Sequence, residues 1–481
     1  MIMRLSELGM DVVDVVKDIE IQGLACDSAK VEKGFLFFCL VGRENDGHTF
    51  AADALSRGAA AIVVERKLAI DCVQIEVSDT RAAIAKAASA FYGHPSKKLK
   101  LIGITGTNGK TTTTYIVKSI VEAAGHTCGL IGTNAVEYAG NKLPSTLTTP
   151  DPIDLHKIFA DMVSAGVEYA VMEVSAHALA LKKVEGIVFE VAAFTNFSRD
   201  HLDFFGDMGS YAEAKKLFFT PEHARTAIIN ADDALGVDIA RVTSLNTITY
   251  GVDNPSDVFG IDLNMSAYGL SYVINMSDRV GNVKFNLTGR FNMYNTLCAA
   301  AVAEALELPF DAVIQGIRDV KKIDGRFNII NTAKCNVIID FAHTDDGIAN
   351  ILRAIREFAP ARIITVFGCG GNRDKTKRAV MGKIVATMSD HCFVTSDNPR
   401  FEPPIDIILQ IESGIKEIGK TNYTPIVDRK EAIRAALDMA DKDDIVLIAG
   451  KGAEQYNDVM GRKQPYNDER YVMEIAGENG F

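Results

Sequence analysis

The glycine-rich stretch GITGTNGKTT, at residues 103–112, constrains this chain more than any other part of the sequence. It overlaps the end of an apolar run at 101–104, which predicts a short buried strand. Apolar residues at helical spacing follow, and they predict a helix that stops near Gly125. Backbone N–H groups on such a strand-to-helix turn form a cradle for an anion. Lys110 could then reach phosphate oxygens, and the Thr111 hydroxyl could bind Mg²⁺.

The spacing within this stretch differs from that of the usual phosphate-binding loop. The usual pattern places four residues between its first glycine and the Gly-Lys pair. Here two residues separate Gly106 from Gly109, and five separate Gly103 from Gly109. The alternative is an ordinary glycine turn followed by an exposed lysine. The strand before the turn and the helix after it favour a shortened phosphate loop.

Length, charge and cysteine content exclude several classes of protein. A chain of 481 residues with 47% hydrophobic residues suggests about three domains with sizeable cores. The net charge of −12 argues against a general nucleic-acid or anionic-membrane surface. No apolar run reaches the length of a membrane span, and the first residues do not form a signal peptide, so we expect no membrane insertion. Eight cysteines without a Cys-x-x-Cys pair predict reduced thiols and a cytoplasmic location.

Residues 1–98 form the first predicted unit, a small α/β domain. Apolar runs at 34–40 and 59–64 predict buried strands, and residues 51–57 predict a short helix between them. The polar clusters Asp27-Ser28 and 46–48 lie in loops beside these elements, where turn chemistry alone explains them. Residues 93–98 predict a linker.

The second unit carries a carboxylate inside a predicted strand. Glu173 lies near the end of the apolar run 169–175, where a lone carboxylate is costly to bury unless it is paired or metal-bound. A carboxylate beside a phosphate loop is a usual Mg²⁺ partner, and a structural ion pair is the alternative. A further strand is predicted at 191–196, before the cluster Asp200-His201-Leu202-Asp203. A lone loop histidine such as His201 is usually just solvated.

One lysine of the second unit falls on the inward face of a predicted helix. Tyr211, Ala214, Lys215 and Phe218 recur at helical spacing, which places Lys215 on the buried stripe. Spacing alone favours a simple account, a snorkelling stem or a salt bridge. Farther on, residues 258–288 alternate polar and apolar and predict hairpin strands. Residues 289–295 then lead into an alanine-rich helix that ends near residue 306, and Gly325 marks a second domain boundary.

The third unit alternates strands with helices. Predicted strands at 337–340, 363–367, 391–395 and 445–449 are each followed by polar residues, and a helix is predicted at 348–358. Open α/β sheets bind ligands at the carboxyl ends of their strands. Four such clusters therefore predict a shared ligand-binding cleft.

Taken together, the motifs of this chain resemble those of the Mur ligases over essentially its full length. The closest resemblance is to the members that add an amino acid to UDP-MurNAc-L-Ala-D-Glu in peptidoglycan synthesis. The motifs that carry it lie at 106–112, 148–151, 173–177, 200–203, 211–215, 289–292, 397–400 and 450–454. The resemblance implies an α/β protein of three domains: an N-terminal UDP-binding domain at 1–98, a central P-loop ATP-binding domain at 99–325 and a C-terminal Rossmann-like domain at 326–481.

The resemblance also implies a role for individual residues. Lys110, Glu173, His201 and Lys215 would be catalytic. Thr111 and Glu173 would hold one Mg²⁺, and His201 and Lys215 would serve a second, with Lys215 carbamylated by CO₂. ATP would contact Gly106, Thr107, Asn108, Gly109, Lys110, Thr111, Thr112, Asn295, Arg326, Asp340 and His343. The UDP-substrate would contact Ser28, Thr148, Thr149, Ser175 and Lys183, and the amino acid would contact Arg373, Asp397, Asn398, Pro399, Arg400, Gly450 and Glu454.

The expected activity follows from this resemblance. ATP converts the D-Glu γ-carboxylate to an acyl phosphate, an amine attacks it, and ADP and phosphate leave. Arg400 ends the 397–400 motif, as in members that add meso-diaminopimelate, whereas lysine-adding members commonly have another residue there. We therefore expect meso-diaminopimelate, with Glu454 binding its distal ammonium. The expected partners are these small molecules alone, and the expected oligomeric state is a monomer.

Several positions depart from the family pattern. Ala176 replaces a usual serine and Ala453 a usual histidine, and Phe341, Asp345, Leu181 and Lys183 also differ. These departures affect mainly the muramoyl-peptide site. Two alternatives stay open: another ligase of the superfamily, such as a folylpolyglutamate synthase, and a P-loop ATPase without ligation chemistry. The second would hydrolyse ATP without either co-substrate.

Overall fold

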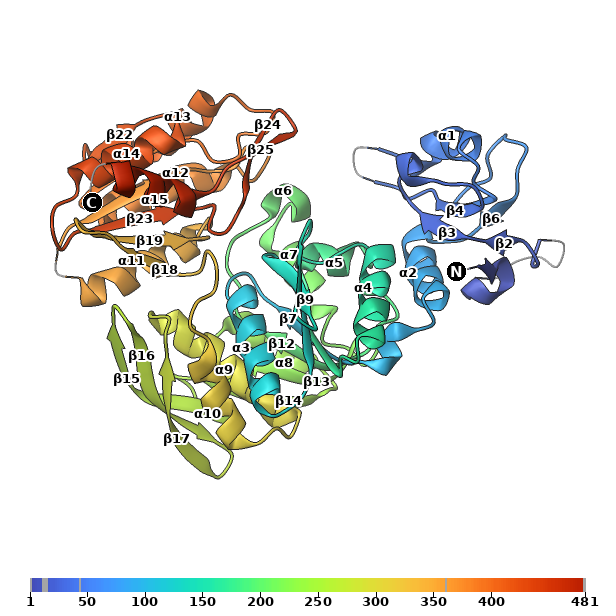
Figure 1. Cartoon of the computed structure of the whole chain (residues 1–481), viewed down its shortest axis with the longest axis horizontal. Coiled ribbons are helices and arrows are strands. Elements are labelled where there is room, and N and C mark those ends of the chain that lie inside the picture. The colour runs from blue at the N-terminus through green and yellow to red at the C-terminus, as the bar shows by residue number, and fades with distance from the viewer. Residues whose placement is uncertain (1, 11–15, 43–44, 360, 479–481) are drawn as a thin grey trace.

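The computed structural model describes residues 2–10, 16–42, 45–359 and 361–478. Figure 1 shows three lobes in chain order, with the N-terminal lobe in blue, the middle lobe in cyan to yellow and the C-terminal lobe in orange and red. Each lobe contains its own β-sheet with helices packed against it. The α/β class and three-lobed organisation that the sequence predicted are confirmed. The boundaries at residues 98 and 325 stay predictions.

The N-terminal lobe is built on a parallel sheet of four strands in the order β3-β4-β5-β6. The predicted strands and the short helix between them are confirmed as β4, β5 and α1. The strands of the lobe are β1 (Met3–Arg4), β2 (Glu20–Ile21), β3 (Gly23–Ala25), β4 (Phe35–Phe38), β5 (Ala61–Val64) and β6 (Gln74–Glu76). Its helices are η1 (Leu5–Leu8), η2 (Ser28–Lys30), η3 (Gly47–Phe50), α1 (Ala51–Ser56), α2 (Thr80–Phe91) and η4 (Pro95–Lys98).

The middle lobe contains an eleven-stranded sheet in the order β10-β9-β8-β11-β7-β12-β13-β14-β15-β16-β17. The strands from β8 to β15 in this order are parallel, and the outer strands are antiparallel. The strands are β7 (Lys100–Thr105), β8 (Cys128–Ile131), β9 (Ala135–Tyr138), β10 (Asn141–Pro144), β11 (Tyr169–Glu173), β12 (Phe189–Phe194), β13 (Ala224–Asn230), β14 (Asn246–Gly251), β15 (Val258–Ser266), β16 (Gly269–Met276) and β17 (Arg279–Phe285). The helices are α3 (Lys110–Ala123), α4 (Pro152–Ser164), α5 (Ala176–Ala180), α6 (Leu202–Phe205), α7 (Met208–Lys216), α8 (Ala234–Val242), α9 (Arg290–Ala305) and α10 (Phe310–Asp319).

Helices cover both faces of the parallel part of this sheet. Ile102 and Ile104 of β7 belong to a core shared with α3, α9 and α10. Leu101, on the opposite face of the same strand, packs in a second core that includes α4 and α8. Burial on both faces explains why β7 is a continuous apolar run rather than an alternating one. It also fixes the strand end from which the phosphate loop emerges.

The C-terminal lobe contains a six-stranded sheet in the order β18-β19-β23-β20-β21-β22, in which only the β18 pairing is antiparallel. A separate hairpin joins β24 to β25. The strands are β18 (Asn328–Asn331), β19 (Asn336–Asp340), β20 (Ile363–Phe367), β21 (His391–Val394), β22 (Tyr423–Pro425), β23 (Ile445–Ala449), β24 (Tyr456–Val459) and β25 (Arg462–Pro465). The helices are α11 (Asp345–Phe358), α12 (Thr376–Met388), α13 (Pro404–Glu417), α14 (Arg429–Met439) and α15 (Asp468–Glu478).

The four predicted strands of this lobe are neighbours in its sheet. β19, β23, β20 and β21 lie side by side and run parallel, so their carboxyl ends meet at one edge. The polar clusters that follow them consequently converge there, as the sequence predicted. Helix α11 lies on the side of this lobe that faces the middle lobe in Figure 1.

Three helix boundaries differ from the sequence prediction by two residues or more. Helix α9 begins at Arg290, so the 290–295 segment is helical rather than a lead into the helix, because Gly289 (φ 99°) makes the turn that starts it. Helix α11 begins at Asp345, three residues before the predicted start, because the Thr344 side chain caps the Gly347 amide. Helix α7 ends at Lys216, so Phe218 lies beyond it although all four residues of the inward stripe are buried.

No helix in the described ranges has both the length and the apolar character that a membrane crossing requires.

The position of helix α3, which follows the phosphate loop, depends on a close contact with helix α10. A Cβ on Gly316 of α10 would lie 2.4 Å from Ile120 Cα and 2.7 Å from Ile120 N of α3, and the Ser119 hydroxyl donates to Gly316 O at 2.7 Å. We predict that Gly316→Ala loosens α3, because overpacking of this kind costs about 1–3 kcal/mol. Hydrogen exchange of the α3 amides should accelerate roughly 5- to 150-fold if they exchange through this opening.

The matched control is Gly477→Ala on α15, where a Cβ meets nothing within 4 Å. Exchange in α3 should be unchanged in that variant. Unchanged α3 exchange in Gly316→Ala would show that the contact does not seat the helix.

Candidate functional site

The loop between β7 and α3 requires glycine at two positions. Gly106 (φ 144°) and Gly109 (φ 86°) have positive φ angles that side-chain-bearing residues rarely adopt. A Cβ on Gly106 would also lie 1.9 Å from Thr195 Oγ1, and one on Gly109 would lie 2.4 Å from Asn295 Oδ1. Backbone conformation and available space therefore both select glycine.

The loop is held by the two residues that follow the neighbouring strand β12. The Asn108 amide donates to Asn196 Oδ1 at 2.9 Å, and the Thr195 hydroxyl donates to Asn108 O at 2.6 Å. The Thr107 amide donates to Asn196 O at 2.8 Å. These bonds occupy two of the loop amides, and helix α3 begins at Lys110 directly behind them. Thr112 lies buried in the first turn of that helix.

Lys110 folds back over the loop. Its ammonium donates to Gly106 O and Thr107 O, each at 2.9 Å. Burial is the main cause that lowers the pKa of Lys110, and Glu173 opposes the shift. The lysine is therefore not the exposed group of an ordinary glycine turn. It lies against the anion cradle.

Glu173 lies at the end of β11 and is 1% exposed. Its Oε1 accepts from the Thr111 hydroxyl at 3.0 Å and the Thr133 amide at 2.8 Å, and its Oε2 accepts from the Thr133 hydroxyl at 3.1 Å. Over the described ranges, no ion pair involves this carboxylate. It thus combines with the Thr111 hydroxyl into a pair of oxygen donors beside the phosphate loop, which is the donor type that Mg²⁺ prefers.

The residues predicted to hold the muramoyl-peptide gather next to Glu173. The Thr149 hydroxyl donates to Glu173 O at 2.9 Å and accepts from the Ser175 amide at 3.1 Å. Thr148 Oγ1 lies 3.0 Å from Thr133 Oγ1. Lys183 donates to Thr149 O at 3.4 Å and pairs with Asp151 at 2.8 Å. Ser28 lies apart from this group, on η2 of the N-terminal lobe.

The C-terminal lobe reaches the phosphate loop through Arg326. This guanidinium donates to Thr111 Oγ1 at 2.8 Å and lies over the Phe341 ring at 4.5 Å. Burial lowers the pKa of Arg326 and raises the pKa of Asp340, which accepts from the Phe327 and Ala342 amides at 2.8 and 2.7 Å. The predicted nucleotide residues from two lobes thus meet at Thr111.

Asp200 is a buried carboxylate that the prediction did not include among the site residues. His201 Nε2 lies 3.2 Å from its Oδ2, His343 Nε2 lies 3.7 Å from Oδ2, and Lys377 Nζ lies 3.7 Å from Oδ1. Burial opposes ionisation, but these three groups together hold the pKa of Asp200 well below its usual range. Burial lowers the pKa of His201 to about 3.

The sequence contained a signal for Asp200 but none for the lysine that lies beside it, Lys377. Asp200 begins the 200–203 motif, so it could have been proposed with His201. Lys377 lies in α12 of another lobe, and nothing in its local sequence links it to Asp200.

Lys215 is fully buried and forms no ion pair with any residue that the structure describes. Its side chain is 0% exposed, and its Nζ has no hydrogen-bond partner in the described part of the chain. The ammonium position lies 4.7 Å from the centre of the Tyr211 ring, and the His201 ring lies 6.0 Å from the same centre. The Tyr211 hydroxyl lies 3.2 Å from Thr107 Oγ1. Burial lowers the pKa of Lys215 far below its usual value, so the snorkelling or salt-bridge account does not describe this lysine.

A second cluster forms where β21 and β23 end. Lys451 is 0% exposed and donates to Asn398 Oδ1 at 2.9 Å and to Glu454 Oε2 at 3.0 Å. Asn398 Nδ2 donates to the same Glu454 oxygen at 2.7 Å. Asp397 lies 3.5 Å from the ammonium, and its Oδ2 would lie 2.3 Å from a Cβ on Gly450. The predicted amino-acid residues Asp397, Asn398, Gly450 and Glu454 are thus together, around a lysine that the prediction did not include.

Arg400 lies against the glycine loop that follows β20, at residues 368–372. Its backbone has φ 50°, and its Nη1 donates to Gly371 O at 2.8 Å. Burial and the nearby Arg373 guanidinium lower the pKa of Arg400. Arg373 is half-exposed and lies 4.0 Å from Asp203 of the middle lobe. Pro399 O would lie 1.9 Å from a Cβ on Gly371, so the two loops touch directly.

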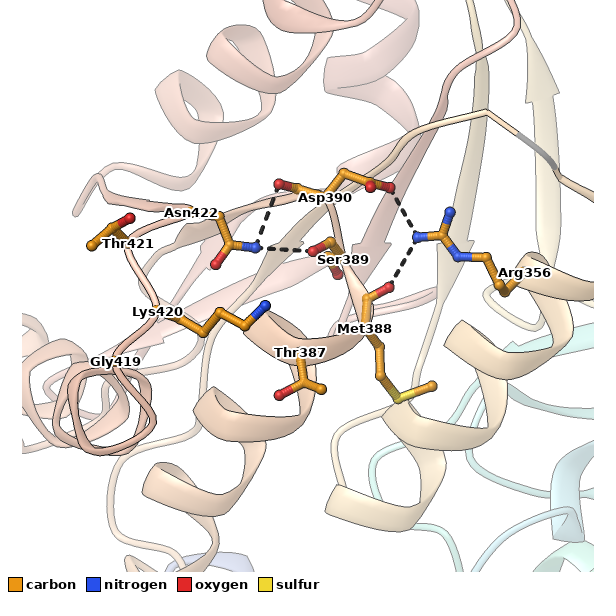
Figure 2. Close-up of a pocket in the computed structure, with 9 residues that line it drawn as sticks. All are labelled: Arg356, Thr387, Met388, Ser389, Asp390, Gly419, Lys420, Thr421 and Asn422. Atoms are coloured by element: carbon orange, nitrogen blue, oxygen red, sulfur yellow. Dashed lines mark hydrogen bonds and ion pairs between the residues drawn. The ribbon is translucent and has the colours of Figure 1, made fainter.

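A surface hollow of about 420 Å³ lies away from all of these residues (Figure 2). It is at the amino end of β21, whereas the predicted residues follow the carboxyl ends. Arg356 in its wall already donates to Asp390 at 2.9 Å and Met388 O at 3.1 Å.

No group of three or more His, Cys, Asp or Glu side chains in the described ranges could hold a metal ion by itself. A metal at the phosphate loop would therefore take some of its ligands from the protein and the others from a bound phosphate, as Mg²⁺ commonly does.

Comparison with known families identifies three matching models in chain order. The Mur ligase family catalytic domain matches residues 20–92, the Mur ligase middle domain matches 104–303, and the Mur ligase glutamate ligase domain matches 325–452. The matches place each model on one of the three lobes.

Curated relatives match nearly the whole chain. A protein of Clostridium acetobutylicum is 43% identical over 95% of this chain and 94% of its own length, and one of Caldanaerobacter subterraneus is 41% identical over 99% and 100%. A relative in Bacillus licheniformis is 40% identical over 95% and 96%. All three are named as UDP-N-acetylmuramoyl-L-alanyl-D-glutamate–2,6-diaminopimelate ligases.

Solved structures agree in fold. A structure of a UDP-N-acetylmuramoyl-L-alanyl-D-glutamate–2,6-diaminopimelate ligase superimposes with a TM-score of 0.70 at 29% identity and covers 100% of both chains. A MurF ligase from Thermotoga maritima, solved in complex with ADP, gives a TM-score of 0.65 at 20% identity and covers 95% of this chain and 97% of its own. With identities of 40–43% over nearly its full length, this chain belongs to the Mur ligase family.

Proposed function

We propose that this chain is an ATP-dependent ligase that joins meso-diaminopimelate to the D-Glu γ-carboxylate of UDP-MurNAc-L-Ala-D-Glu. The observation that carries the proposal is that Glu173 and Arg326 both bond to Thr111 of the phosphate loop. The phosphate loop provides Thr111, the muramoyl-peptide cluster provides Glu173, and the C-terminal lobe provides Arg326, with contacts of 3.0 and 2.8 Å. The names of the curated relatives support the same reaction.

The proposed chemistry follows from a carboxylate being a poor electrophile. Transfer of the γ-phosphoryl group of ATP to the D-Glu carboxylate forms an acyl phosphate and ADP. The neutral amine of the amino acid attacks the acyl carbon, and the tetrahedral intermediate expels phosphate, leaving the amide. Lys110 and the amides at the start of α3 stabilise charge on the phosphoryl oxygens. Approach of the C-terminal lobe excludes water, which would hydrolyse the acyl phosphate.

Mg²⁺ fits the donor set of the proposed nucleotide site. Thr111 Oγ1 and Glu173 Oε1 are hard oxygen donors 3.0 Å apart beside the phosphate loop. When bound, Mg²⁺ neutralises charge on the phosphate oxygens. A second ion would use His201 and a carbamate on Lys215.

The carbamate proposal rests on the environment of the Lys215 amine. The amine is buried and has no hydrogen-bond partner in the described ranges, which is costly for any polar group. A neutral lysine amine adds to CO₂ to give a carbamate and one proton. The product is an anionic oxygen donor. It would lie near His201 and the phosphate loop, because Lys215, His201 and Thr107 of that loop all lie next to Tyr211.

Selection of the amino acid is assigned to the cluster around Arg400. meso-Diaminopimelate and L-lysine differ by one distal carboxylate. The Arg400 guanidinium can form a bidentate pair with such a group, and Arg373 lies on the adjoining loop. Glu454 is available for an ammonium, although it bonds to Lys451 and Asn398 in this structure. Binding the substrate ammonium would therefore require these bonds to be shared or exchanged.

We also propose that the chain acts as a cytoplasmic monomer. All eight cysteines are free thiols, which suits a reducing compartment. Light scattering of the purified chain with and without its substrates tests the monomer, and fractionation of the source cells tests the location.

The proposed function is tested by phosphate release from ATP with UDP-MurNAc-L-Ala-D-Glu and a panel of amino acids. We predict that turnover requires both co-substrates, and that Lys110→Ala reduces kcat by about 10²–10³, since an electrostatic contact to the transferring group is lost. The control is Lys118→Ala on the same helix, whose ammonium pairs with Glu122 at the surface. ATP hydrolysis that ignores both co-substrates would instead identify an ATPase without ligation chemistry.

A second prediction concerns Lys215. Intact mass and carbon-13 NMR under ¹³CO₂ should show one carbamate, favoured at higher pH because its formation releases a proton. Lys215→Ala should be nearly inactive and partly rescued by formate, a small carboxylate. Lys216→Ala is the matched control, because its neighbouring ammonium pairs with Glu213 and Asp238 at the surface. Full activity with an unmodified Lys215 would contradict the carbamate.

A third prediction concerns Arg400. Leaving a buried charge without its partner costs roughly 3–5 kcal/mol, so wild type should prefer meso-diaminopimelate over L-lysine by about 10² to 4 × 10³ in kcat/KM. Arg400→Ala should collapse this ratio with little change in KM for ATP. Arg353→Ala, an exposed arginine on α11, should leave the ratio unaltered. Equal use of both amino acids by wild type would disprove the assignment.

A further inference from the structure

A buried ion pair lies directly behind Arg400. Arg378, in the first turn of α12, is 0% exposed, and it faces Glu402, two residues after Arg400. Arg378 Nη1 donates to Glu402 Oε2 at 2.9 Å and Nη2 donates to Oε1 at 3.0 Å. This bidentate arrangement fixes the relative orientation of the two side chains, which a lysine at the same position could not do.

The same two side chains also bind the glycine loop that follows β20. Arg378 Nη2 donates to Gly370 O at 3.1 Å, and Glu402 Oε1 accepts from the Asn372 amide at 2.5 Å. Arg378 Nη1 additionally donates to Gln410 Oε1 of α13 at 2.9 Å. The pair therefore joins three segments: the glycine loop, the 398–402 segment and α13.

These bonds surround the segment in which Arg400 is held. The Gly371 amide donates to Asn398 O at 3.0 Å, and the Phe401 amide donates to Asn372 Oδ1 at 3.1 Å. Arg400 Nη1 donates to Gly371 O, and a Cβ on Gly370 would lie 2.9 Å from that nitrogen. The direction of the Arg400 guanidinium therefore depends on where the glycine loop lies.

The backbone at Arg400 needs such support. Its φ of 50° is a left-handed conformation, which is strained for a residue other than glycine. Strained backbone of this kind persists only where surrounding contacts hold it. The hairpin β24–β25 holds one side, since the Arg400 amide donates to Asp458 O at 3.0 Å and Arg400 O accepts from the Met460 amide at 2.8 Å. Arg378 and Glu402 hold the other.

We propose that the Arg378–Glu402 pair is a positioning pair that aims Arg400 at the distal carboxylate of the amino acid and so sets the preference for that substrate. The inference rests on the proposed function and deepens it. A merely structural pair would affect stability and both amino acids alike. A positioning pair affects the amino acid with the distal carboxylate more than the one without it.

Other charged groups near the pair do not replace it. Lys375 lies 3.4 Å from Glu402 Oε2, but its side chain is 62% exposed. Exposed pairs of this kind contribute little. The hydrogen bonds from Arg378 are the main cause that lowers the pKa of Glu402, to about 2, so this carboxylate is ionised at any ordinary assay pH.

The test uses Glu402→Gln, which keeps the shape and removes the charge, and Arg378→Lys, which keeps the charge and removes the fork. Both are compared with wild type in the full reaction. We expect kcat/KM for meso-diaminopimelate to fall at least tenfold through its KM, while KM for ATP and for the UDP-substrate changes less than twofold. The ratio of kcat/KM for meso-diaminopimelate to that for L-lysine should fall by a similar factor.

The matched controls change a comparable pair at the opposite edge of the same sheet. Arg362 donates to Asp444 through Nε at 3.1 Å and Nη2 at 2.6 Å, before β20 and β23 begin. Asp444→Asn and Arg362→Lys should leave the amino-acid ratio at its wild-type value. If the Glu402→Gln ratio is also unchanged, or if both amino acids lose activity equally, the positioning role is overturned.

Hydrogen exchange gives a readout that does not depend on the substrate. Amides at 370–372 and 400–402 should exchange faster in Glu402→Gln and Arg378→Lys than in either control, with α2 of the N-terminal lobe unaffected in all four. If wild type rejects meso-diaminopimelate, the proposed function fails, whereas unaltered exchange in these loops would overturn the positioning pair itself. ATP binding by each variant confirms that it has folded.

Discussion

The hydrogen bonding of Glu173 is the constraint on which the rest of the candidate site depends. This buried carboxylate receives the Thr111 hydroxyl from the phosphate loop and two donors from Thr133, and its own backbone oxygen receives Thr149. Thr111 in turn receives Arg326 from the C-terminal lobe. Glu173 therefore links the nucleotide loop to the peptide cluster directly, and it links both to the C-terminal lobe through Thr111. The donors to the carboxylate are hydroxyl and backbone groups, and no ion pair in the described ranges involves it.

The site concentrates charged groups whose burial is only partly compensated. Lys215 has no hydrogen-bond partner in the described ranges, and Asp200 lies 3.2–3.7 Å from His201, His343 and Lys377. In a purely structural core such groups would be costly. Such groups near the phosphate loop are consistent with the phosphoryl transfer proposed above. The cations Lys377 and Arg326 come from the C-terminal lobe, so the electrostatics of the centre depend on how closely two lobes approach.

Local sequence was sufficient where one physical signal dominated. The apolar run at 101–104 and the glycines after it predicted β7, its turn and α3, because strand burial and positive φ leave few alternatives. The inward stripe of α7 placed Lys215 inside. Local sequence did not reveal the start of α9. The turn at Gly289, with φ 99°, lets that helix begin six residues earlier than the alanine-rich pattern suggested. Resemblance, rather than spacing, provided the roles of His201 and Lys215.

By itself, the sequence determined the α/β class, the phosphate loop and the order of the polar strand ends, because each depends on neighbours a few residues away. Only the tertiary structure decided which of these polar groups meet. Lys377 reaches Asp200, Lys451 lies among Asn398 and Glu454, and Arg378 clamps the loop that carries Arg400. These are pairings between residues distant in the chain or on different elements. They depend on strand order and on how the lobes pack. Hydrophobic burial across whole sheets determines that order and packing, and the motifs that contain the charged residues do not.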